Sequence, residues 1–169
     1  MKNKTKRLAV LSLLTALALI LSFVESQFPP IYIAVPGIKM GLPNIIIIFA
    51  LYKFSFFEAL SISLIRVLIT SLLFSNAQMF IYSLFGAVLS LTIMVILKKT
   101  SLFTTVGISI AGGVFHNLGQ IIAAVILLDT IQLGYYMSVL LVTGSIAGVL
   151  IGLCAAILLN RTKNINMNF

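Results

Sequence analysis

The sequence predicts an all-α membrane protein of six transmembrane helices. Of its 169 residues, 61% are hydrophobic and only 8% are charged, whereas soluble domains carry about 25% charged residues. Several apolar segments reach the length of about 20 residues that a helix needs to cross a bilayer. The alternating ten-residue segments of a membrane β-barrel are not seen. We find no linker or internal repeat, so we expect a single integral membrane domain over residues 1–169.

The apolar segments place the six helices in order along the chain. Their expected bounds are about 8–24, 41–53, 55–74, 78–97, 102–128 and 133–159. We expect the first helix to be retained, because the residues that follow it contain no small-x-small signal-peptide cleavage site. The second segment, of about 14 residues from Gly41, is too short for an upright span. Its start is interrupted by Gly41 and Pro43, which is typical of a helix beside a cavity.

The connection over residues 25–40 is the longest between predicted helices. Pro29, Pro30 and Pro36 exclude a regular helix through it, because proline lacks an N–H and restricts the residue before it. The apolar piece over residues 31–35 indicates that the connection folds back onto the membrane domain. It is either a lid over a cavity or an interfacial cap without a ligand, and the sequence favours neither.

The cations indicate the orientation. Six crossings gather nine of the eleven Lys and Arg residues on one side of the membrane. These nine are Lys2, Lys4, Lys6, Arg7, Lys53, Lys98, Lys99, Arg161 and Lys163. The positive-inside rule then predicts that both termini are cytoplasmic. Because the cations lie between apolar runs rather than on one folded basic face, the net charge of +8 does not predict nucleic-acid binding.

Arg66 is the first candidate for chemistry. It follows Ser55, the start of the third predicted helix, by eleven residues and so lies near mid-membrane. Burying an arginine there costs at least about 2.5–3.5 kcal/mol, so it normally has a partner. Glu58 is about 12 Å away along the helix, and Glu25 is a candidate if the 25–40 connection folds inward. We favour an anion-binding role, and the alternative is a structural ion pair or a contact with helix-end carbonyls.

The fifth predicted helix carries the only histidine, His116. Gly113, His116, Asn117 and Gln120 are spaced i, i+3, i+4 and i+7, so they line one face of a helix. The alternative is a histidine hydrogen-bonded between helices, but its amide neighbours favour a polar pocket. Weaker candidates to complete this pocket are Tyr32, Lys39, Asn44 and Gln78.

Small residues predict where helices approach closely. Gly144, Gly148 and Gly152 repeat every four residues in the sixth predicted helix, which is a strong signal for tight packing. Ser12 and Ala16 leave a shallower groove on the first helix, where another helix could approach. The single cysteine, Cys154, lies in an apolar run and suggests a packed thiol.

The acidic residues are too few for several enzyme classes. The chain has only three, namely Glu25, Glu58 and Asp129, and it has no phosphate-binding P-loop. Enzymes that condense prenyl diphosphates hold magnesium with clustered aspartates, because the metal demands oxygen ligands. We therefore expect no metal site, no cofactor and no catalytic activity of the chain alone.

Two parts of the sequence resemble motifs of a known family. One is PGIKMGLPN over residues 36–44, and the other is Gly112 and Gly113 followed by HNLGQ over residues 116–120. They resemble the small membrane family described as heptaprenyl diphosphate synthase component I, also called the Gx transporter family. That family is similar to the substrate-binding S components of energy-coupling-factor transporters, which are six-helix proteins of this size. The resemblance implies an S-component-like bundle with a pocket beneath the connection between helices 1 and 2. It also implies docking, through Ser12 and Ala16, onto a transmembrane coupling subunit driven by two cytoplasmic ATPases.

We therefore expect a multi-pass, substrate-binding protein of the bacterial plasma membrane. Its substrate would be a small anionic molecule, such as a flavin nucleotide or an isoprenoid or quinone precursor. An alternative of a different class is the non-catalytic component I of a heptaprenyl diphosphate synthase, and a third is a helical scaffold without a ligand. The expected substrate-binding residues are Lys39, Asn44, Arg66, Gln78, His116, Asn117 and Gln120.

Overall fold

A computed structural model describes residues 2–27, 41–74 and 76–164. The described residues form six α-helices, as the sequence predicts. These are α1 (Lys2–Ser26), α2 (Asn44–Lys53), α3 (Phe56–Phe74), α4 (Ala77–Thr100), α5 (Thr105–Leu128) and α6 (Met137–Arg161). A short 3₁₀ helix, η1 (Ile131–Tyr136), precedes α6. The connection was expected to begin at residue 25, but Glu25 and Ser26 belong to α1. The rest of it over residues 28–40, with Tyr32 and Lys39, lies outside the described residues.

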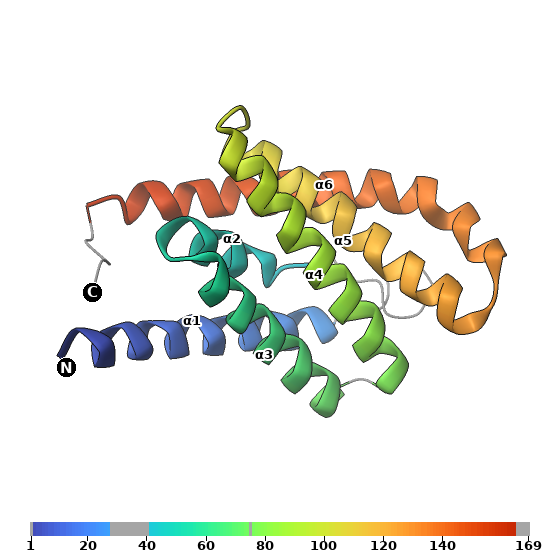
Figure 1. Ribbon diagram of the computed structural model, residues 1–169, viewed down its shortest axis with the longest axis horizontal. Coiled ribbons are helices and arrows are strands. Elements are labelled where there is room, and N and C mark those ends of the chain that lie inside the picture. The colour runs from blue at the N-terminus through green and yellow to red at the C-terminus, as the bar shows by residue number, and fades with distance from the viewer. Residues whose placement is uncertain (1, 28–40, 75, 165–169) are drawn as a thin grey trace.

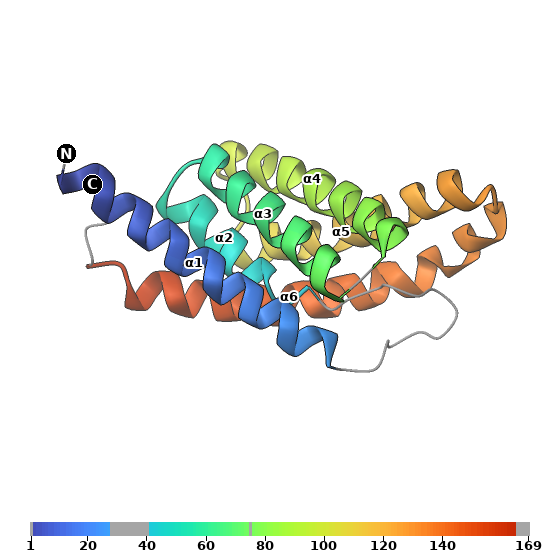
Figure 2. The ribbon, with the colours of Figure 1, turned by 90° about the horizontal axis from the view of Figure 1, so that it is seen from below.

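Five of the six helices are long and apolar enough to cross a membrane, and α2 is not. Its ten residues rise about 15 Å, roughly half of the 30 Å hydrocarbon layer. The six predicted helices are therefore present as five long candidate spans and one half-length helix, and the short length of the second agrees with its short apolar segment in the sequence. Figures 1 and 2 show the start of α1 and the end of α6 at the same end of the molecule, as an even number of passes requires. Which side of the membrane this end faces stays a prediction.

Local signals explain several helix ends. The side chain of Asn76 accepts a hydrogen bond from the Met79 N–H, and that of Thr104 accepts one from the Gly107 N–H. These N-caps satisfy amides that the first turns of α4 and α5 leave open. The residues after α4 and α5, Ser101 and Asp129, have positive φ angles of 56° and 48°. A left-handed residue commonly ends a helix in this way.

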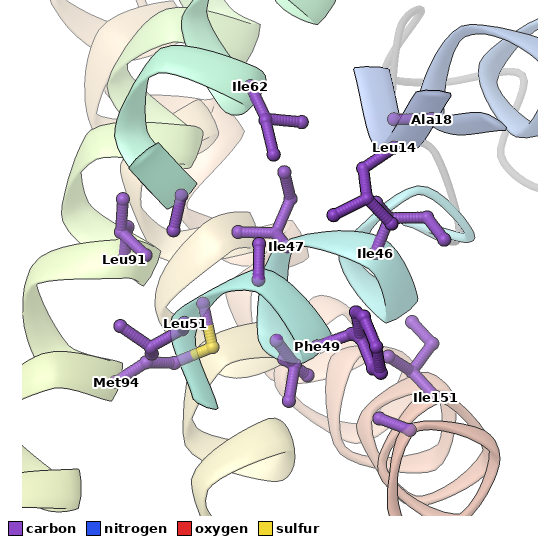
Figure 3. Packing of buried hydrophobic residues seen from close by; sticks show 14 of the residues in the cluster. Leu14, Ala18, Ile46, Ile47, Phe49, Leu51, Ile62, Leu91, Met94 and Ile151 are labelled. Carbon is purple, nitrogen blue, oxygen red and sulfur yellow. The ribbon is translucent and has the colours of Figure 1, made fainter. Parts of the chain in front are cut away.

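The short helix α2 lies at the centre of the hydrophobic core. Seven of its ten residues are buried, so it contacts protein nearly all round. In Figure 3 its isoleucine, phenylalanine and leucine side chains meet Leu14 of α1, Ile62 of α3, Met94 of α4 and Ile151 of α6. The long helices instead keep large apolar residues such as Leu72 exposed on their outer faces, which suits contact with lipid.

Helices α5 and α6 approach each other at the predicted glycines. A methyl group on Gly148 would lie 2.6 Å from the Cα of Ile110, and one on Gly152 would lie 2.8 Å from the Cα of Val106. A methyl group on Gly144 would lie 2.9 Å from the carbonyl oxygen of Gly113. Side chains at these positions would force the backbones apart. Cys154, on the same helix, is exposed, so the expectation of a packed thiol is wrong. It follows Gly152 by two residues, about 200° around the helix, and so points away from the face that meets α5.

Candidate functional site

A small polar cavity lies where five segments of the chain meet. Its volume of about 10 Å³ is close to the space that one water molecule needs. The lining comes from α1, from the turn that precedes α2, and from α3, α4 and α5. The lining residues are Ser22, Glu25, Gly41, Arg66, Val67, Thr70, Ser83, His116 and Gln120. Arg66 and His116 each lie near the middle of a spanning helix, so the cavity is deep in the bundle.

Arg66 is the main cation of this cavity. Only 7% of the surface of this residue is exposed. Its Nε and Nη2 atoms are buried, and neither has a hydrogen-bond partner among the described residues. A buried polar group without a hydrogen bond costs about 1–3 kcal/mol, and a charged one costs more. Two of the three guanidinium nitrogens are therefore strong donors without an acceptor in the described part of the chain.

Glu25 brings a negative charge to the same cavity. It lies in the last turn of α1, is buried, and interacts electrostatically with Arg66. One of its oxygens, Oε1, accepts a hydrogen bond from the backbone N–H of Gly41. The carboxylate thus joins the end of α1 to the start of α2. Glu58, the other acid considered as a partner of Arg66, forms an ion pair with Arg7 at 2.5 Å instead.

His116 and Gln120 reach the cavity from α5, one turn apart. Gln120 Oε1 is buried and has no hydrogen-bond partner in the part of the chain that is described. The hydroxyl of Thr70 donates to the Arg66 carbonyl at 2.7 Å, so its oxygen can still accept. Around a bound group the cavity would therefore offer guanidinium donors on one side and amide and hydroxyl groups on the others.

Three of the expected substrate-binding residues lie elsewhere. Asn117 donates through Nδ2 to the Leu140 carbonyl at 2.9 Å, so it ties α5 to α6. Asn44 lines a separate cavity of about 10 Å³ between α2, α4, α5 and α6. Gln78 is exposed in the first turn of α4. Lys39 lies outside the described residues.

The lining includes polar residues that the sequence analysis did not single out, among them Ser22, Thr70 and Ser83. For two of them, the spacing from a charged residue in the sequence could have indicated a place in the site. Thr70 follows Arg66 by four residues and Ser22 precedes Glu25 by three, so each shares a helix face with a charged residue. Ser83 offers no such signal, because the fourth helix has no charged residue near it.

Fold and site together define a polytopic helical membrane protein with a deep, charged cavity. In the described ranges, no group of three His, Cys, Asp or Glu side chains could hold a metal ion. Residues 14–158 match the family model described as heptaprenyl diphosphate synthase component I, and the chain belongs to that family. No curated protein and no solved structure matches the chain.

Proposed function

We propose that this protein is the substrate-binding membrane subunit of an energy-coupling-factor-type transporter, and that its central cavity captures the anionic group of a small molecule. The observation that carries the proposal is the buried Arg66 guanidinium, two of whose nitrogen atoms have no acceptor among the residues that the structure describes. In a medium of low dielectric constant, a charge-assisted hydrogen bond to an anion is strong. A planar guanidinium matches a carboxylate or phosphate in particular.

Capture requires the cavity to enlarge, because about 10 Å³ holds little more than one water molecule. Helix α1 is the element best placed to move. It packs mainly on α3 and α2. It runs along one edge of the bundle in Figure 1 and crosses the face nearest the viewer in Figure 2. Its last turns supply Ser22 and Glu25 to the lining. A flavin nucleotide or an isoprenoid or quinone precursor would then place its anionic group at Arg66.

The test is native mass spectrometry of gently purified protein, with Arg66→Gln as the variant. We expect the wild-type protein to carry a small anionic molecule and the variant to lose it, because the variant has neither the charge nor the fork of donors. Arg161→Gln is the matched control, since it removes the same charge from an exposed residue at the end of α6. Circular dichroism checks that each variant keeps its helices. A wild-type protein without any bound molecule, or Arg66→Gln retaining it, would count against the proposal.

The proposed partners are a transmembrane coupling subunit and two cytoplasmic ATPases. Ser12 and Ala16, one turn apart on α1, are exposed, which leaves a shallow surface for a partner helix. Replacing Ala16 with leucine would fill this surface. ATPase subunits should co-purify with the wild-type protein and be lost from Ala16→Leu.

A second function is favoured by the family's description, which names a component of heptaprenyl diphosphate synthase. With three acidic residues in the whole chain, it cannot assemble an aspartate-rich magnesium site by itself. Under this function the protein would be the non-catalytic membrane partner of a separate catalytic chain. The same co-purification distinguishes the two, because a soluble aspartate-rich synthase in place of ATPases would favour the second.

A further inference from the structure

An open groove of about 530 Å³ lies at the end of the bundle where α2 and α6 end and α5 begins. The start of α1 lies at this same end of the molecule (Figures 1 and 2). Because α6 is a spanning helix that ends at Arg161, the groove is at the level where the bundle leaves the apolar layer. Its lining residues are Tyr52, Lys53, Thr105, Ala156, Leu159, Asn160 and Lys163.

The groove is positively charged. Lys53 donates through Nζ to the Thr162 carbonyl at 2.6 Å, which uses one of the three N–H groups of its ammonium. Lys163 is exposed. Lys98 lies beside the groove, with Nζ 4.9 Å from the ring centroid of Tyr52. The first turn of α5, at Thr105, adds the partial positive charge of a helix N-terminus.

No acidic residue neutralises these cations from within the groove. The chain has only three acids, and each is placed by the structure. Glu25 lines the Arg66 cavity, and Glu58 is paired with Arg7. Asp129 follows the last turn of α5, whereas the groove lies at the first, about 36 Å away along the helix. The positive charge is therefore available to an external anion.

One wall of the groove is apolar and continues onto a lipid-facing surface. Ala156 and Leu159 line the groove from α6. Next to them, Ile157 and Leu158 are 61% and 40% exposed. A ligand that joins a phosphate to a long apolar chain would meet cations at its head and apolar side chains below, and this combination is what a membrane lipid presents.

We propose that this groove binds the phosphate headgroup of an anionic membrane lipid, with the acyl chains lying against α6. Lys53 and Lys163 would neutralise the phosphate, and Asn160 and Thr105 would supply uncharged hydrogen bonds. This site shares no residue with the Arg66 cavity, so it holds whether or not the protein is a transport subunit.

The test is a titration of the purified protein with phosphatidylglycerol in detergent, with lipid adducts counted by native mass spectrometry. A lysine near an anionic phosphate contributes enough for about a fivefold change in affinity. We expect Lys163→Gln to weaken binding about fivefold and Lys53→Gln/Lys163→Gln about 25-fold. Lys163→Gln leaves the hydrogen bond between Lys53 and Thr162 in place. This single variant therefore still tests the proposal if the double variant does not fold.

The matched control is Lys4→Gln/Lys99→Gln, which removes the same charge from exposed lysines outside the groove. We expect this control to bind phosphatidylglycerol within about twofold of wild type, since screening weakens distant exposed charges. Equal weakening in the control would overturn the proposal, because it would mean that the whole basic end attracts lipid. Two other results would also overturn the proposal. One is that phosphatidylcholine binds as tightly as phosphatidylglycerol, and the other is that inorganic phosphate displaces phosphatidylglycerol at a concentration equal to that of the lipid.

Discussion

Ser90 and Ser109 face the same small cavity between α2, α4, α5 and α6, yet their hydroxyls differ. Ser90 donates to the Gly112 carbonyl at 2.8 Å and so joins α4 to α5. Ser109 Oγ is buried without a hydrogen-bond partner among the described residues. A hydrogen bond contributes about 0.5–1.5 kcal/mol, whereas leaving a buried hydroxyl unsatisfied costs about 1–3 kcal/mol. At this scale the same residue type can stabilise or destabilise.

Alanine at these two positions should therefore have opposite effects. We expect Ser90→Ala to lower the free energy of unfolding by about 0.5–1.5 kcal/mol and Ser109→Ala to leave it unchanged or raise it. Thermal unfolding of both variants in the same detergent measures the difference. A loss at Ser109 as large as that at Ser90 would contradict the expectation, and would mean that an ordered water satisfies the Ser109 hydroxyl.

At the scale of elements, the contact between α5 and α6 determines which neighbours the polar face of α5 meets. The sequence placed Gly113, His116, Asn117 and Gln120 on one face, and the structure divides this face between neighbouring elements. Gly113 and Asn117 contact α6 at Gly144, whereas His116 and Gln120 line the Arg66 cavity. A helix face is wide enough to meet two neighbours, and the glycines of α6 draw one half of this face against that helix.

Gly148→Ala tests this contact. Its new methyl group would lie 2.6 Å from the Cα of Ile110 and 2.9 Å from the Ser109 carbonyl oxygen, so the two backbones must separate. Overpacking of this kind costs about 1–3 kcal/mol, and we expect the midpoint of thermal unfolding to fall. Gly134→Ala is the matched control, because nothing lies within 4 Å of a methyl group there. Similar midpoints for the two variants would mean that α5 and α6 do not rely on this close approach.

At the scale of the whole molecule, six passes bring the chain back to the end at which it started, although α2 is only half a span long. The turn between α5 and α6 lies at the opposite end (Figures 1 and 2). Nine Lys and Arg residues in the described ranges lie in the first two turns of α1 or at helix ends that share the end of the molecule where α1 starts and α6 ends. They are Lys2, Lys4, Lys6, Arg7, Lys53, Lys98, Lys99, Arg161 and Lys163. The positive-inside rule predicts that this end is cytoplasmic.

Cysteine labelling tests the orientation. The variants Lys4→Cys, Gly134→Cys and Lys163→Cys would each be made in a Cys154→Ala background. Intact cells expressing each variant would then be treated with a membrane-impermeant maleimide. We expect only Gly134→Cys to react before the membrane is permeabilised. Labelling of Lys4→Cys and Lys163→Cys from opposite sides would contradict the six-pass arrangement. Labelling of both from outside would reverse the orientation.

The sequence alone was sufficient for properties that depend on composition, local length and spacing. The apolar runs predicted an all-α membrane protein and its six helices, because crossing a bilayer requires about 20 apolar residues in a row. The four-residue spacing of Gly144, Gly148 and Gly152 indicated a close helix contact, since small side chains on one face let another backbone approach. Arg66, His116 and Gln120 were noticed because polar groups in apolar helices are costly and therefore rare.

Only the tertiary structure decided which of these groups meet. It brought Glu25 and Ser22 from the end of α1 to Arg66, and it directed Asn117 to α6 and Asn44 to a different cavity. The half-length of α2 is visible in the sequence, but its burial at the centre of the core is not. The reason is physical: periodicity fixes the direction of a side chain relative to its own helix axis, whereas the position and rotation of each helix depend on packing against segments far away in the chain.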